Sequence, residues 1–333
     1  MASAHGEFLL AQGAHFTEEG SLQHFGTPFD NVMAYSQHLK VLSLTGEDAL
    51  NFLHGQLTCD MHFVAQGNAL FAAHLNLQGR VLFSLWVLPS PDAEEGTGFR
   101  LIVPAAMVEQ VQEHWKKYLM FSRSTLHVED TLAVLQVPTT HGAAVAKVFN
   151  IAHDELSHND TWQHFTALEQ HYFIAPQAAL EDQWKALQTV GAIGGVMQAH
   201  YWDVMAGLAQ VYPGAEQRFL PQALNYDLFQ AVSFNKGCYT GQEVVARMKF
   251  KGQLKQRLMH LCWEDAVIPS PGDALRNEQG RALGHVVTHI TYKGKQHALA
   301  VIRRDQPLPD HVEDRPITAT LEPLPYALPE EGK

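Results

Sequence analysis

The sequence predicts an α+β protein built from two or three packed domains. The chain has 333 residues, of which 46% are hydrophobic, and this is enough apolar material for more than one buried core. Before residue 256, runs with strand periodicity alternate with runs with helix periodicity, whereas short β-rich runs dominate afterwards. These observations indicate mixed α+β domains followed by a small all-β barrel or sandwich.

The first part of the chain predicts a strand, a helix and a hairpin. HLKVLSLT alternates apolar and polar residues like a strand, and the following GEDALNFLHGQL places Leu50, Leu53 and Leu57 at helical spacing. Next, NALFAAHLNLQGRVLFSLWVLP contains two β-rich runs that are interrupted between Asn76 and Gly79. Turn residues between two such runs are typical of a β-hairpin.

Residues 98–190 predict a βαββαβ-like unit. FRLIVP has the composition of a strand, and AAMVEQVQEHWKKYLMF carries apolar residues at helical spacing. The same order returns in LAVLQV, a helix near 143–149, HYFIAP and a helix near 177–190. We therefore expect a second domain of alternating strands and helices here.

The region after residue 256 predicts only strands and turns. RLMHLCW, RALGHVVTHIT, HALAVIRR and ITATLEPL are β-rich, and the turn sequences SPGD and NEQG separate some of them. This pattern indicates the small barrel or sandwich. The final PLPYALPEEGK is rich in proline and is expected to run along the surface.

Composition argues against several classes of protein. Three cysteines, Cys59, Cys238 and Cys262, cannot pair completely, so a reducing cytoplasm fits best. The N-terminus lacks the features of a signal peptide, and no apolar run is long enough to span a membrane. A net charge of −12 repels phosphate backbones and leaves at most a weak, local nucleic-acid contact. Twenty histidines without HExxH or CxxC favour no dedicated metal site.

The stretch KGCYTGQE, which begins at Lys236, permits a purely structural interpretation. Thr240 and Glu243 fit the capping box S/T-x-x-E, in which Thr240 would cap the helix EVVARMKFK that follows. The two glycines would allow tight turns. This interpretation leaves Lys236, Cys238 and Tyr239 unexplained.

Cys238 also has two features of a reactive thiol. It precedes the expected helix N-terminus and lies two residues from Lys236, and both fields favour a thiolate. A lone cysteine is, however, often a small buried hydrophobe, so both interpretations stay open. Residues 236–257 are the most basic part of the chain, which predicts either a solvated helix face or a binding site for an anion.

KGCYTGQE matches the motif K-G-C-[FY]-x-G-Q-E and resembles the signature of the YgfZ family. These proteins are folate-binding, tRNA-modifying relatives of the glycine-cleavage T-protein. TGEDALNFLHGQLTCDM, FLPQALNYD and LEPLPYAL resemble other segments of the family, so the likeness covers roughly residues 30–328.

The resemblance implies the T-protein fold, with intertwined domains around a central folate channel. It implies a T-protein-like folate domain of residues 30–97 and 191–255, a ferredoxin-like domain of residues 98–190, and a C-terminal β-barrel of residues 256–328.

The same resemblance implies that tetrahydrofolate is the cofactor. Trp202 in YWDVMAGL would stack on the flat pterin ring, although a core tryptophan fits equally well. Ala209 replaces a proline common in relatives, and SQHLKV lacks a second family tryptophan. The folate-binding residues that the resemblance implies are Trp202, Lys236, Gly237, Tyr239, Gln242, Glu243 and Arg247.

The function implied by the resemblance is an auxiliary role for iron–sulfur enzymes, notably those that thiolate tRNA, with Cys238 as the working thiol. T-proteins carry an acidic pair on the strand after the glycine turn, but GRVLFSLWV at residues 79–87 has no carboxylate. The amides of Asn76 and Gln78 cannot replace a charged acid. The usual aminomethyltransferase mechanism is therefore disfavoured.

Two alternatives to this auxiliary role stay open. One is a folate-dependent one-carbon transferase that uses Glu243 or Asp60 as its acid or base. The other is a non-catalytic folate-binding module. The expected partners are folate and iron–sulfur client enzymes.

Overall fold

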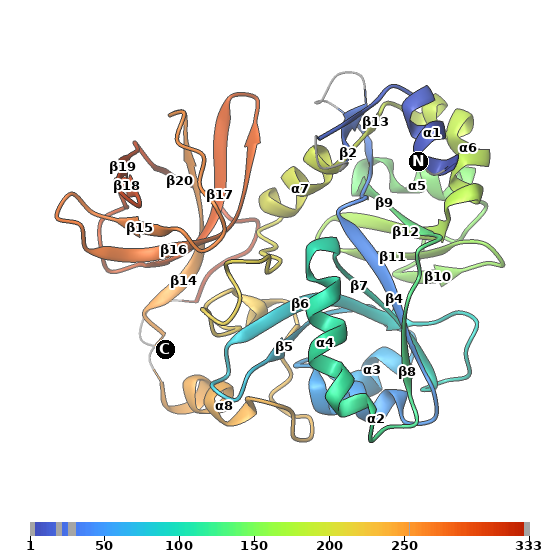
Figure 1. Ribbon diagram of the computed structural model, residues 1–333, viewed down its shortest axis with the longest axis horizontal. Coiled ribbons are helices and arrows are strands. Elements are labelled where there is room, and N and C mark those ends of the chain that lie inside the picture. The colour runs from blue at the N-terminus through green and yellow to red at the C-terminus, as the bar shows by residue number, and fades with distance from the viewer. Residues whose placement is uncertain (1–3, 18–21, 26–30, 253, 330–333) are drawn as a thin grey trace. The chain divides into compact units, whose positions relative to one another are not determined.

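The computed structural model describes residues 4–17, 22–25, 31–252 and 254–329, and the chain divides into two compact units (Figure 1). The first unit contains Met1–Leu50, His62–Ala69 and Trp86–His200, and the second contains Asn51–Met61, Leu70–Leu85 and Tyr201–Lys333. Residue 30, where the first predicted domain begins, and the end of the proline-rich tail lie outside the described residues. The predicted three-domain boundaries stay a prediction.

A six-stranded sheet carries the main core of the first unit. Its strands, in spatial order, are β10 (Leu156–His158), β11 (Gln163–Ala167), β12 (Gln170–Pro176), β9 (Leu132–Pro138), β3 (Met33–Tyr35) and β13 (Ile193–Gly194). All neighbours are antiparallel except β13 and β3. Leu9, Val145 and Trp184 pack with strand residues in one buried cluster. They come from α1 (Ala4–Ala11), α5 (Thr139–Val148) and α6 (Gln177–Val190), so these helices cover the sheet.

A second set of strands in this unit is centred on β4 (Leu39–Thr45). It pairs antiparallel with β7 (Gly98–Pro104) and β8 (Thr125–Val128), which α4 (Val108–Leu119) connects. The second half of β6 (Val81–Pro89) pairs with β7. Residues 98–190, expected as one βαββαβ unit, therefore contribute strands to two sheets. The strands β1 (Ala14–Phe16) and β2 (Leu22–Phe25) form a small separate sheet.

The second unit contains the predicted β-rich C-terminal region as one curved seven-stranded sheet, drawn orange to red in Figure 1. Its strands, in spatial order, are β19 (Arg315–Pro316), β18 (His311–Val312), β15 (Ala274–Arg276), β16 (Ala282–Tyr292), β17 (Lys295–Arg303), β14 (Gln256–Trp263) and β20 (Thr320–Glu322). Leu261, Trp263 and Val286 lie in its buried cluster. The expected all-β C-terminal part is confirmed.

The predicted hairpin is confirmed between β5 (Leu70–Leu75) and β6. Asn76 Oδ1 accepts hydrogen bonds from the backbone N–H groups of Gln78 and Arg80, both at 3.0 Å. Gly79 has a φ of +72°, which an L side chain rarely adopts. The amide and the glycine thus close the turn locally, which is why the sequence alone revealed it.

The remaining helices are short. They are α2 (Ala49–Gln56), α3 (Met61–Ala65), α7 (Val196–Met205), α8 (Gln242–Lys251) and the 3-10 turns η1 (Ala105–Met107) and η2 (Tyr226–Leu228). Of the helices in the described ranges, none has both the length and the apolar character needed to span a bilayer.

Candidate functional site

The turn KGCYTGQE is fixed to the loop after α2 by Lys236. Its Nζ donates hydrogen bonds to the backbone carbonyls of His54 at 2.6 Å, Leu57 at 2.8 Å and Cys59 at 2.7 Å. A helix that ends at Gln56 leaves its last carbonyls without partners in the helix, and an ammonium group has three N–H donors. Lys236 therefore clamps two segments that are about 180 residues apart in the chain.

Lys236 keeps its charge at neutral pH even though burial disfavours it. Burial lowers the pKa of Lys236 to about 8, although the nearby Cys59 and Asp60 act in the opposite direction. Lys236 is thus still protonated at pH 7. Burial raises the pKa of the Cys59 thiol to about 12, so Cys59 is neutral. The buried ammonium is balanced by carbonyl dipoles rather than by a thiolate.

Cys238 is exposed, whereas Cys59 and Cys262 are buried. The residue before it, Gly237, lies against an imidazole ring, because a Cβ added there would come within 3.5 Å of His54 Nε2. The other ring nitrogen of His54, Nδ1, lies 3.7 Å from a carboxylate oxygen of Asp60. A histidine and a carboxylate are therefore held beside the turn that presents the thiol.

Asp60 was predicted from the sequence as an acid or base, whereas His54 was not. Both residues lie in HGQLTCD, within a segment quoted for its family resemblance. The family resemblance of that segment could therefore have pointed to His54.

The predicted capping box at Thr240 is wrong. The helix α8 begins at Gln242, its N-cap is Gly241, and no side chain caps it. Gly241 has a φ of +79°, and a Cβ added to it would meet the backbone carbonyl oxygen of Asn76 at 2.5 Å. The close packing of the turn on the β5–β6 hairpin thus requires glycine at the N-cap and displaces Thr240, whose N–H donates to Gly55 O at 3.3 Å. The predicted end of the helix near Gly252 is confirmed.

Tyr239 is the buried aromatic residue of the turn, with 7% of its surface exposed. Lys236 Nζ lies 5.1 Å from the centre of its ring, a cation–π distance. Its hydroxyl group is buried without a hydrogen-bond partner among the described residues. Buried hydroxyl groups are normally paired, so this one is available to a polar group of a ligand.

The other predicted site residues differ in exposure. Gln242 is half-buried in the first turn of α8, whereas Glu243 and Arg247 are exposed. Trp202 is half-buried in α7. Their joint contact with one folate molecule stays a prediction.

The basic segment around the turn is only partly available to a ligand. Arg257 is buried and its guanidinium binds both carboxylate oxygens of Asp227, at 2.6 and 3.1 Å. With Lys236 also used internally, the remaining exposed bases of residues 236–257 are Arg247, Lys249, Lys251 and Lys255. Among the described residues, no group of three or more histidine, cysteine or acidic side chains is arranged to hold a metal ion.

The fold identifies the structural class. The glycine cleavage system aminomethyltransferase T from Bartonella henselae has a similar crystal structure, with a TM-score of 0.71 over 96% of each chain. The two sequences are 15% identical, so the likeness concerns the fold alone. The chain is thus an α+β protein with the T-protein fold, as predicted.

Sequence comparison then identifies the family. The chain is 30% identical over 304 residues to the tRNA-modifying protein YgfZ of Sodalis glossinidius, covering 87% of this chain and 91% of that protein. It is 28% identical over 306 residues to the protein of the same name from Shigella sonnei, covering 86% and 91%. No family model matches the sequence. The chain belongs to the YgfZ family.

Proposed function

We propose that this protein binds tetrahydrofolate and supports tRNA modification, with Cys238 as its working thiol. The observation that carries the proposal is that Cys238 is exposed on a turn clamped by Lys236, whereas the other two cysteines are buried. A thiol meant only to fill space would be buried like Cys59. The relatives named tRNA-modifying protein support the same role.

The residues around the turn fit a reduced folate. The hydroxyl of Tyr239, which has no hydrogen-bond partner in the described part of the chain, and the amide of Gln242 suit the polar edge of a pterin ring. The exposed guanidinium of Arg247 suits a glutamyl carboxylate, and Trp202 offers a flat ring for stacking. When bound, tetrahydrofolate would supply a carrier for one-carbon units.

His54 and Asp60 would prepare Cys238 for reaction. Transfer of the thiol proton to His54 would leave a thiolate, and Asp60 would stabilise the imidazolium that forms. A thiolate is the reactive form of cysteine and the form that binds iron. This chemistry supports the finer proposal that the clients are iron–sulfur enzymes, including those that thiolate tRNA. The three unpaired cysteines support a cytoplasmic location.

A one-carbon transferase is the second candidate. Asp60 favours it, since this carboxylate lies beside the turn and pairs with His54. Against it, the buried strand β6 carries no carboxylate where T-proteins carry their acidic pair. A transferase would form a one-carbon product from a folate donor, which mass spectrometry would detect.

The replacement Cys238→Ser tests the role of the thiol. The variant should fold and bind tetrahydrofolate in calorimetry, because the side chain is exposed. It should nevertheless fail to restore tRNA thiolation in cells that lack the native factor. Cys262→Ser is the control, and it should restore thiolation. Full rescue by Cys238→Ser would show that the sulfur is dispensable and would leave a non-catalytic folate-binding module.

A further inference from the structure

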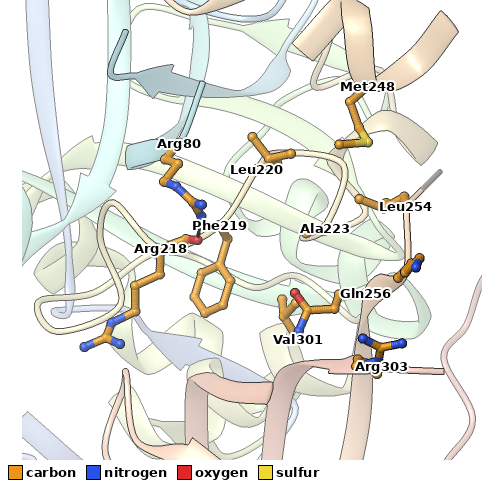
Figure 2. Close-up of a pocket in the computed structure, with 11 residues that line it drawn as sticks. Arg80, Arg218, Phe219, Leu220, Ala223, Met248, Leu254, Gln256, Val301 and Arg303 are labelled. Atoms are coloured by element: carbon orange, nitrogen blue, oxygen red, sulfur yellow. Dashed lines mark hydrogen bonds between the residues drawn. The ribbon is translucent and has the colours of Figure 1, made fainter. Parts of the chain in front are cut away.

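The second unit contains a basic pocket that the proposed folate site does not use. Its volume is about 410 Å³, and its wall includes residues before β6, before β14 and at the end of β17 (Figure 2). Its basic residues are Arg80, Arg218, Lys255 and Arg303. Apolar side chains, among them Phe219 and Leu220, form the rest of its wall. A concave site of this size with an apolar wall and a few charged groups is typical of small-ligand sites.

Backbone pairing brings two of the arginines together. Val81 N–H donates to the carbonyl of Phe219 at 2.8 Å, and Val81 O accepts from Gln217 N–H at 2.8 Å. This pairing places Arg218 opposite Val81, beside Arg80. The guanidinium of Arg80 then donates to the backbone carbonyl of Arg218. Figure 2 shows this contact, and the side chain of Arg218 extends away from it.

Three of the four cations form no ion pair with a carboxylate among the described residues. Arg303 is paired through two hydrogen bonds with Asp305, at 2.9 and 2.6 Å. Arg80 and Arg218 make side-chain hydrogen bonds only to backbone carbonyls. Lys255 forms no hydrogen bond or ion pair in the described part of the chain, although its charge also helps to lower the pKa of Asp305. The pocket thus carries an uncompensated positive charge in a chain whose net charge is −12.

We propose that this pocket binds a small organic phosphate, such as a nucleotide. Arginine guanidinium groups match phosphate oxygens through paired hydrogen bonds, and three cations suit a terminal phosphate dianion better than a single carboxylate. The apolar wall suits the organic part of the ligand. A long RNA backbone fits less well, because it needs a continuous basic surface and the protein is acidic overall.

Calorimetry with adenosine 5′-monophosphate, adenosine and pyrophosphate tests the proposal. Adenosine 5′-monophosphate and pyrophosphate should bind saturably and adenosine should not, and added salt should weaken binding. Lys255→Gln should raise the Kd of adenosine 5′-monophosphate about tenfold, because one charge-assisted contact is lost. Arg218→Gln should do the same. Arg281→Gln is the matched control, since Arg281 is exposed and lies outside the pocket.

Several outcomes would overturn the proposal. These are no binding of either phosphate compound at millimolar concentration, or equal affinity in all three variants. Competition only by folate polyglutamate would make the pocket an extension of the folate site. Tighter binding of a single-stranded RNA oligonucleotide, weakened by the same substitutions, would make it an RNA contact instead. The binding titrations with the phosphate compounds contain no folate. Their failure therefore leaves the proposed folate function untouched.

Discussion

The clamp formed by Lys236 gives the sharpest test of how the thiol-bearing turn is built. Lys236→Met keeps the apolar chain but removes the ammonium group, so the carbonyls of His54, Leu57 and Cys59 lose their common donor. Three charge-assisted hydrogen bonds at about 1.5 kcal/mol each amount to about 4.5 kcal/mol. A pKa lowered from 10.5 to about 8 corresponds to a net cost of about 3 kcal/mol for the charged group in the folded state, which the substitution relieves. We therefore expect the variant to be less stable by about 1 kcal/mol at pH 7.

The pH dependence of this difference has a definite sign. The unfolded chain keeps Lys236 protonated up to about pH 10.5, whereas the folded protein releases the proton near pH 8. Between these values the unfolded state binds more protons, so this group makes the folded state more stable as the pH rises. Below pH 8 Lys236 is protonated in both states, and this additional stability of the folded state is absent. Lys236→Met lacks this contribution, so its deficit relative to the wild type should widen between pH 8 and pH 10.

Urea unfolding from pH 7 to pH 10 measures both effects. Lys251→Met is the matched control, because Lys251 is an exposed lysine in the same segment, and it should follow the wild type at every pH. The variant should also react faster with a thiol reagent at Cys59, since the loop around that buried cysteine is released. A Lys236→Met protein with wild-type stability and an unchanged pH slope would refute the clamp.

Two further predictions concern Gly241 and a pair of buried histidines. Gly241→Ala should destabilise by about 2 kcal/mol or more in urea unfolding, because the left-handed backbone adds strain and the Cβ meets a backbone carbonyl at 2.5 Å. Gly280→Ala has the backbone strain without the steric contact, and it should cost only about 1 kcal/mol. Thr240→Ala should change stability by less than about 0.5 kcal/mol. Equal effects at all three positions would contradict this account of the turn. Burial and the charge of nearby histidines lower the pKa of His164 to about 3 and that of His171 to about 4. Below pH 6.5 the unfolded state therefore binds more protons than the folded state. Stability should fall by up to about 1.4 kcal/mol per pH unit for each histidine as the pH drops toward 4. His164→Gln should flatten this acid slope in urea unfolding, and a slope unchanged by the substitution would show that other groups cause it.

Local sequence patterns determined the elements that are stabilised by contacts between residues close in the chain, such as hairpins and helices. The hairpin at Asn76–Gly79 depends on an amide and a glycine three residues apart, and the helix expected near 177–190 is observed as α6 over Gln177–Val190. The β-rich region after residue 256 was likewise visible, because adjacent antiparallel strands carry their turns between them. The motif KGCYTGQE also pointed to the turn on which the exposed Cys238 lies, and its role as the functional site stays a prediction.

Only the tertiary structure decided what the residues of that motif do. Lys236 binds carbonyls 177 to 182 residues away, and no periodicity or spacing in the sequence reports such a contact. The same contacts place His54 beside Gly237. Packing against the hairpin made Gly241 the helix cap and overrode the capping signal of Thr240. Short-range sequence patterns report the conformational preference of one segment. The Lys236 clamp, the Gly241 cap and the basic pocket depend instead on which distant segments pack together.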